Sequence, residues 1–123
     1  MKPFKPDGWH TLTPRIFTQD VAGLVGFLRS VFGAHGEVRS GAPCEIRIGD
    51  SIVMISDGGG VRAALPAFLY VYVADADATY RRAIEVGART VEAPMDTPYG
   101  DRRATVEDSW GNSWQIATFR GVA

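Results

Sequence analysis

The chain has little of what several large protein classes need. Its single cysteine, Cys44, cannot form an internal disulfide and allows no cysteine-rich zinc site. Its 13 basic and 14 acidic residues leave a net charge of -1, which gives no basic field for nucleic acid. No apolar run approaches the roughly 20 residues that span a bilayer, and Met1–Trp9 is polar rather than a signal segment. These absences favour a reduced, cytoplasmic protein without nucleic-acid or membrane partners.

Motifs that carry chemistry are also scarce. The chain has only two histidines, His10 and His35, and neither lies next to Cys44 in a nucleophile arrangement. The run Gly58–Gly60 lacks the Lys-Ser/Thr and the helix that a phosphate-binding loop requires, and no dinucleotide fingerprint is present. The motifs therefore assign no catalytic residue and no cofactor.

What the chain does have is enough apolar sequence for one core. About 46% of its 123 residues are hydrophobic, which is typical of a single domain, here taken as residues 1–123. The pattern predicts a strand over His10–Thr18, disturbed by Pro14, which cannot donate to a ladder. Asp20 then caps a helix that ends at Gly33. Three strands are expected next, at Glu37–Ser40, Cys44–Ile48 and Ser51–Ser56.

The second half repeats this order. A strand over Ala67–Val73 precedes a helix capped by Asp75 or Asp77 and closed by Gly87. The remaining strands are expected at Arg89–Glu92, Arg103–Glu107 and Ser113–Thr118. The sequence thus predicts an α+β fold of two βαβββ repeats, at about 10–57 and 66–119, with a connector at about 58–65.

Several segments, in this order, resemble the vicinal oxygen chelate superfamily, which includes glyoxalase, bleomycin-resistance and dioxygenase-like proteins. The segments that carry the resemblance are Trp9–Pro14, Phe32–Ala34, Glu45–Ser51, Tyr99–Arg102 and Asp108–Trp114. The resemblance implies two curved mixed sheets that enclose a cleft, and a homodimer. It does not imply one reaction, because the superfamily holds both enzymes and non-catalytic drug binders.

Metal-dependent members take His or Glu ligands from four strand positions, and the resemblance places these near Thr13, Met54, Tyr70 and Gln115. None of the four is His or Glu, and a thioether is a soft ligand that suits copper(I) rather than magnesium or zinc. We therefore expect no metal. Instead, Tyr70 and Gln115 are expected to face the cavity, where their polar ends either bind a ligand or satisfy each other.

Five further residues are candidates for a ligand site, each with a structural alternative. Arg15 and Glu45 would pair if both face inward, or else lie solvated on the outer face. Trp114 stacks on a ligand or packs in the core. Tyr99 and Arg102 belong to a loop that either contacts an anion or only shapes a turn.

These patterns lead to one hypothesis and one alternative. The first is a metal-independent protein that binds an apolar or aromatic small molecule, in resistance or sequestration. The alternative is a divergent lyase, isomerase or dioxygenase-like enzyme that recruits a divalent metal through His10 and Glu45.

Overall fold

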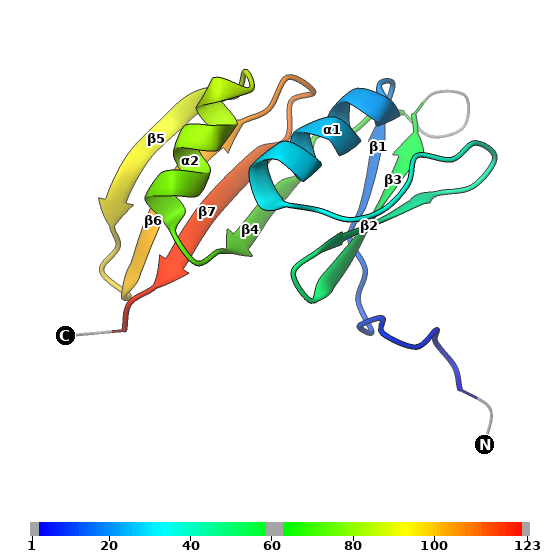
Figure 1. Cartoon of the computed structure of the whole chain (residues 1–123), viewed down its shortest axis with the longest axis horizontal. Coiled ribbons are helices and arrows are strands. Elements are labelled where there is room, and N and C mark those ends of the chain that lie inside the picture. Colours follow the sequence, from blue (N-terminus) through cyan, green and yellow to red (C-terminus); the bar gives the residue numbers. More distant parts are fainter. Residues whose placement is uncertain (1–2, 59–62, 122–123) are drawn as a thin grey trace. The chain divides into compact units, whose positions relative to one another are not determined.

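The computed structural model describes residues 3–58 and 63–121, and Figure 1 shows their helices and strands. Within these residues one strand–helix–strand–strand segment is followed by one strand–helix–three-strand segment. The chain divides into two compact units, Met1–Arg29 with Gly33–Leu65 and Ser30–Phe32 with Pro66–Ala123. Two mixed sheets and two helices confirm the predicted α+β class.

The first unit is built on a three-stranded sheet in the order β1-β3-β2. Its elements are β1 (Arg15–Thr18), α1 (Val21–Phe32), β2 (Cys44–Ile48) and β3 (Ser51–Asp57). Strand β1 runs parallel to β3, and β2 runs antiparallel to it. Ile16 on β1, Ile46 on β2 and Ile55 on β3 are buried, and on the central strand β3 the neighbouring residues Ile52 and Val53 are both buried.

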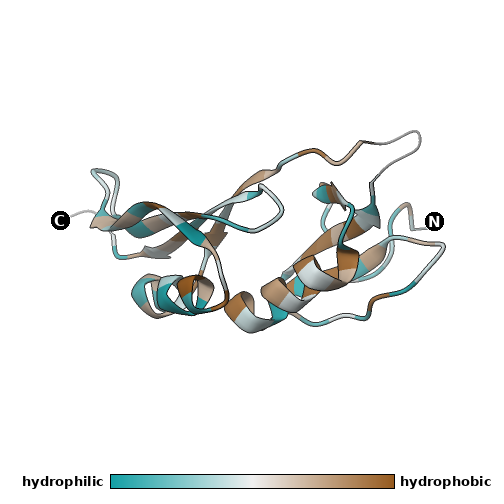
Figure 2. Cartoon of the chain, turned by 90° about the horizontal axis from the view of Figure 1, so that it is seen from above, coloured by the Kyte–Doolittle hydropathy of each residue, from teal (hydrophilic) through white to brown (hydrophobic). Residues whose placement is uncertain are grey.

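Helix α1 begins and ends where the sequence predicts. The Asp20 carboxylate accepts a hydrogen bond from the Gly23 N–H at 3.0 Å. Gly33 closes the helix with a φ of 64°, a left-handed conformation that glycine adopts without steric cost. Leu24 and Leu28 on the helix are fully buried, and Figure 2 shows that α1 is more hydrophobic than the second helix.

Two predictions for the first unit are wrong. The strand expected over His10–Thr18 begins only at Arg15, directly after Pro14, which has no N–H to donate. No strand forms over Glu37–Ser40, so this segment has two strands after the helix instead of three. There the Arg39 N–H donates to the Cys44 sulfur and its Nε to the Pro43 carbonyl, bonds within a loop that replace a ladder.

The second unit has the complete predicted βαβββ order. Its elements are β4 (Phe68–Tyr72), α2 (Ala76–Glu85), β5 (Arg89–Asp96), β6 (Asp101–Glu107) and β7 (Ser113–Phe119). The sheet order is β4-β7-β6-β5, with β4 parallel to β7 and the other pairs antiparallel. Strand β5 is longer than the predicted Arg89–Glu92, and it carries Pro94 at a sheet edge where register shifts occur.

Helix α2 lies over one face of this sheet (Figure 1). The Arg102 guanidinium bonds Asp77 on α2 at 3.0 Å, so Arg102 points to the helix side and its neighbours on β6 point away. We call the face that points away from α2 the open face. By cross-strand register, its side chains include Phe68, Tyr70, Tyr72, Asp101, Arg103, Thr105, Glu107, Ser113, Gln115, Ala117 and Phe119.

The turn between β6 and β7 is organised by the buried carboxylate of Asp108. Its Oδ1 accepts from the N–H groups of Trp110 and Asn112, both at 2.9 Å. Its Oδ2 accepts from the Asn112 amide at 2.9 Å and from the Trp114 indole at 2.8 Å. This turn lies within Asp108–Trp114, one of the segments that carry the family resemblance. In this structure its hydrogen bonds fix the turn that joins β6 to β7.

The predicted connector over 58–65 lies partly outside the described residues, which omit 59–62. Gly58 still extends the first sheet, because its N–H donates to the Thr18 carbonyl at 2.7 Å. Neither helix of the described part of the chain combines the length and the apolar character that crossing a membrane requires.

Candidate functional site

The open face of the second unit is centred on one carboxylate with two phenols. Tyr70 donates its hydroxyl proton to Asp101 Oδ2 at 2.6 Å, and Tyr72 donates to the same oxygen at 2.9 Å. The two rings are 5.4 Å apart between centroids and tilted by 59°. Strand β4 presents both tyrosines on one face because they are two residues apart, and β6 supplies the carboxylate.

A second row of polar contacts leads away from this carboxylate. Arg103 Nη1 donates to the Tyr99 hydroxyl at 2.8 Å, and the Tyr99 and Tyr70 hydroxyls are 3.3 Å apart. Because the Tyr70 proton is used on Asp101, the bond between the two phenols has Tyr99 as its donor. The hydrogen bonds therefore run in one direction, from Arg103 through two tyrosines to Asp101.

The far end of the open face carries a second carboxylate. Glu92 on β5 accepts from the Thr105 hydroxyl at 2.6 Å and from Arg103 at 3.3 Å. Gln115 Nε2 donates to the same Thr105 hydroxyl at 3.4 Å. One row of side chains crosses the whole sheet, because each residue in it is the cross-strand partner of the next. The row consists of Tyr70, Gln115, Thr105 and Glu92.

The aromatic side chains of this face remain accessible although their polar ends are bonded. Phe68 is 67% exposed, Tyr72 61% and Tyr99 52%, while Asp101 beneath them is only 2% exposed. Large aromatic side chains gathered and exposed on one surface are typical of a binding site rather than of a solvated face. The site therefore has a bonded polar floor and an accessible aromatic surface.

The phenols of this site are held in their neutral form. Burial of the hydroxyl end, followed by the hydrogen bond to Asp101, raises the pKa of Tyr70 above its ordinary value. The bond to the same carboxylate raises the pKa of Tyr72. Neither tyrosine is therefore a phenolate nucleophile or a metal-binding phenolate at neutral pH.

The candidates on the first unit also form a row. Arg15 and Glu45 are both cross-strand partners of Met54, one from each side. Of the two alternatives for Arg15 and Glu45, the mutual ion pair is not formed. Glu45 pairs with Arg39 at 2.6 Å, while Arg15 bonds the Ser56 hydroxyl at 3.1 Å and stands over the Phe17 ring at 4.9 Å. Thr13 lies before β1, outside the sheet.

Two candidates lie away from the open face. Trp114 is 1% exposed and bonds Asp108, so the structure favours the core alternative for it. Arg102 pairs with Asp77 and Asp96 on the helix side, so the structure favours the turn alternative for that loop. Of the loop candidates, only Tyr99 joins the aromatic cluster.

Sequence reasoning missed the residues that organise the site. Asp101 was interpreted as a turn residue, while Glu92, Arg103 and Thr105 were not singled out. The signal that was present is the period of two that places Phe68 and Tyr72 on the same face as Tyr70. The cross-strand partner of a residue cannot be read from one strand alone, so Asp101 could not be assigned to the tyrosines.

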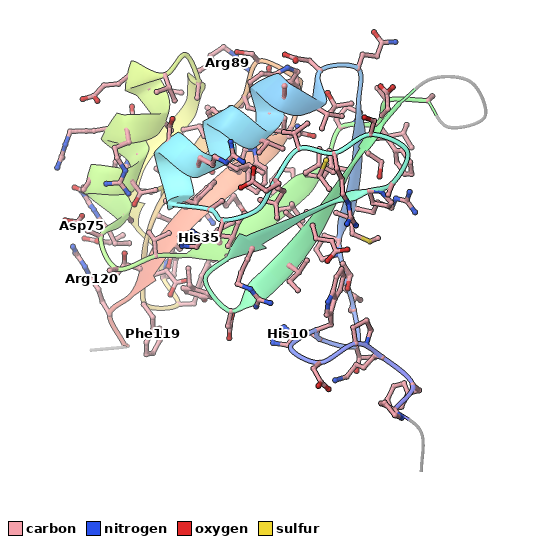
Figure 3. All side chains as sticks on the ribbon, turned by 45° about the vertical axis from the view of Figure 1, so that its right-hand side comes forward. His10, His35, Asp75, Arg89, Phe119 and Arg120 are labelled. Carbon is pink, nitrogen blue, oxygen red and sulfur yellow. The ribbon has the colours of Figure 1, made fainter. Side chains whose placement is uncertain are left out.

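The residues at the four family ligand positions do not fit a hard divalent ion. The Tyr70 hydroxyl is committed to Asp101 and the Gln115 amide donates to Thr105. In the described residues no group of three or more His, Cys, Asp or Glu side chains is arranged to hold a metal. Figure 3 shows His10 on the segment before β1 and His35 after α1, and both are exposed.

The comparisons with known proteins agree with the fold. An uncharacterized protein of Mycobacterium bovis is 29% identical over 122 residues, covering 85% of this chain and 80% of that protein. The crystal structure of TioX from Micromonospora sp. ML1 matches with a TM-score of 0.76 at 24% identity, covering 89% of this chain and 98% of TioX. The fosfomycin resistance protein FosX from Mesorhizobium loti matches with a TM-score of 0.67 at 20% identity, covering 89% and 91%.

The family model gives the assignment. The model described as Glyoxalase/Bleomycin resistance protein/Dioxygenase superfamily matches residues 9–116, which include every strand and helix except the end of β7. Together with the two mixed sheets and the complete second βαβββ segment, this match shows that the chain belongs to the Glyoxalase/Bleomycin resistance protein/Dioxygenase superfamily.

Proposed function

We propose that this chain binds an aromatic or apolar small molecule on the open face and that binding requires no metal. The observation that carries the proposal is the cluster of exposed aromatic side chains, Phe68, Tyr72 and Tyr99, above a polar floor centred on the buried Asp101 carboxylate. Tyrosine rings offer large contact areas at a low entropic cost because few torsions must be fixed. A flat ligand stacked on these rings gains apolar contact without breaking the bonds beneath.

The chemistry of the floor argues for binding rather than turnover. Asp101 accepts two phenol protons, and Glu92 accepts from a hydroxyl and a guanidinium. Both bonds fall on one oxygen of each carboxylate, and a carboxylate whose charge is stabilised by such donors is a poorer general base than a free one. The proposed biological role is sequestration or resistance in the cytoplasm, in keeping with a superfamily whose name includes bleomycin resistance proteins.

The test uses isothermal titration of the purified chain with naphthalene-sized compounds, followed by chemical analysis of the recovered compound. We expect saturable binding, unaffected by a metal chelator, and an unchanged compound after long incubation. Tyr72→Ala should weaken binding about tenfold, since one stacked aromatic ring contributes roughly 1 kcal/mol beyond its area. Tyr80→Ala is the matched control, because Tyr80 is on α2 and bonds Thr90 instead of the open-face floor. Conversion of the compound, or no binding by any member of the panel, would overturn the proposal.

Metal content is tested separately. The chain is exposed to nickel, zinc, manganese and ferrous ions, desalted and analysed for bound metal. We expect less than stoichiometric retention, because the four family positions offer a hydroxyl, a thioether, a phenol and an amide. Retention of one ion per chain would contradict metal independence and would favour the enzyme alternative, with His10 as the first residue to substitute.

We also propose that the chain is a homodimer. Strand β4 lies at the edge of its sheet, so one side of its backbone has no partner strand within that sheet, and it carries exposed aromatic side chains. Proteins usually cover such an exposed strand edge. Sedimentation equilibrium should give twice the 13.3 kDa chain mass at micromolar concentration. A monomer at every concentration tested would contradict this proposal without affecting the small-molecule site.

A further inference from the structure

The carboxylate at the centre of the open face is buried without a cation. Asp101 is 2% exposed, and none of the residues that the structure describes forms an ion pair with it. Its charge is stabilised by the hydroxyls of Tyr70 and Tyr72, both on Oδ2. Neutral donors stabilise a buried carboxylate but do not cancel its charge, so a negative field extends to the rings above it.

The surrounding charges leave this field in place. The open-face network contains two carboxylates, Asp101 and Glu92, and one guanidinium, Arg103, which leaves one negative charge. Arg103 bonds Glu92 and reaches Asp101 only through the phenols of Tyr99 and Tyr70. The excess negative charge therefore belongs to the Asp101 end of the face, below Tyr70 and Tyr72.

The hydrogen-bond directions point the same way. The phenol protons of Tyr70 and Tyr72 are both donated to Asp101, so neither hydroxyl offers its proton to a ligand. The Tyr70 oxygen accepts from Tyr99, whereas the Tyr72 oxygen remains available as an acceptor. The two rings pack against each other at 5.4 Å and 59°, and their outer faces are electron-rich. These ring faces, the Tyr72 oxygen and the unneutralised carboxylate all attract positive charge and repel anions.

We propose that the ligand of the open face is an organic cation, a quaternary or planar aromatic ammonium, whose charge lies against Tyr70 and Tyr72 above Asp101. This inference rests on the proposed function, since it names the ligand class of the same site. Cation–π attraction would supply selectivity over a neutral ring of equal size, and Asp101 would strengthen it through the two phenols.

The experiment compares three ligands of nearly equal size and different charge on the unmodified chain. N-methylquinolinium is the cation, 1-methylnaphthalene the neutral analogue and 1-naphthoate the anion, each titrated at neutral pH and low salt. We expect the cation to bind about tenfold more tightly than the neutral compound, and the anion to bind least. Added salt should weaken the cation only, because screening acts on charge.

The outcomes separate the two proposals. Equal affinity for the cation and the neutral compound would overturn the organic-cation inference while leaving the aromatic site intact. Binding of none of the three would overturn both. Preference for the anion would overturn the inference and would indicate that the Arg103 end of the face attracts the charge of the ligand.

Variants then locate the preference. Asp101→Asn keeps an acceptor for the phenols but removes the charge, so it should lower the ratio of cation affinity to 1-methylnaphthalene affinity about tenfold. Asp96→Asn is the matched control, because the Asp96 side chain is 71% exposed and paired with Arg102 and Arg120. Tyr72→Phe keeps the ring and the Asp101 charge but removes one of the two hydroxyls bonded to that carboxylate, and it should retain the preference for the cation. A preference unchanged in Asp101→Asn would refute the role of Asp101.

Discussion

Replacing Asp108 with asparagine should be among the most damaging isosteric changes in this chain. The carboxylate is 4% exposed and accepts four hydrogen bonds, two on each oxygen. Asparagine has one oxygen and one NH2 group, so in either orientation two of the four donors face another donor. The donors that lose their acceptor are either the two backbone N–H groups or the side-chain nitrogens of Asn112 and Trp114.

The magnitude follows from the bonds that are lost. A hydrogen bond to a charged group contributes about 1.5–3 kcal/mol, so two lost bonds correspond to about 3–6 kcal/mol. Removing the buried charge relieves part of its desolvation cost, which brings the expected loss to about 3 kcal/mol. For a chain of 123 residues that loss lowers Tm by about 10 °C.

The assay is thermal unfolding followed by circular dichroism and calorimetry at neutral pH, with urea unfolding to give the free energy. Asp96→Asn serves as control because its side chain is 71% exposed, and exposed ion pairs contribute about 1 kcal/mol at most. If Asp108→Asn melted within about 2 °C of the unmodified chain, the four-bond turn would not be what stabilises the β6–β7 hairpin.

Four further outcomes are expected. Tyr70 should ionise well above its ordinary pKa, so the neutral phenol that bonds Asp101 persists until high pH. Because Asp101 contributes to the raised pKa, Asp101→Asn should shift the appearance of tyrosinate absorbance at 295 nm to lower pH. The ion pair with Arg102 lowers the pKa of Asp77, so its contribution is present above the ordinary carboxyl pKa and is lost in acid. Acid unfolding of Asp77→Asn should therefore show a weaker pH dependence below about pH 4. Gly36→Ala should destabilise strongly, because its Cβ would lie 2.4 Å from the Glu45 carbonyl oxygen at a φ of 141°. The same exchange at Gly26 in α1, where no atom lies within 4 Å, should stabilise by up to about 1 kcal/mol in urea unfolding.

The features predicted correctly from sequence are those fixed by neighbours along the chain. Asp20 caps α1 and Gly33 ends it because the cap bonds join residues three or four positions apart. The strand predicted over Glu37–Ser40 failed for the opposite reason. Of its four residues only Val38 is β-prone, and Arg39 bonds Cys44 within a local loop, while an isolated bridge joins His35 to Arg47 of β2.

The candidate site shows the same division between local and non-local information. Tyr70 and Gln115 are expected to face one cavity, and the structure makes them cross-strand partners, because both lie inside strands whose alternation can be counted. The anion and turn alternatives for Arg102 could not be separated from sequence, because the predicted strand begins at Arg103 whereas β6 begins at Asp101. A shift of one residue reverses the face of a side chain, so candidates at strand ends are the least secure.

Asp101 shows why the centre of the site could not be derived from sequence. Its bonds to Tyr70 and Tyr72 cross from β6 to β4, two strands that are not adjacent, because β7 lies between them. That proximity depends on the registers of two strand pairs at once, and an error of one residue in either would break it. The same geometry makes the site specific in its chemistry. A carboxylate placed below two inward-donating phenols and away from Arg103 gives an aromatic surface that favours positive charge, whereas an Arg103–Asp101 ion pair would have left the same rings neutral.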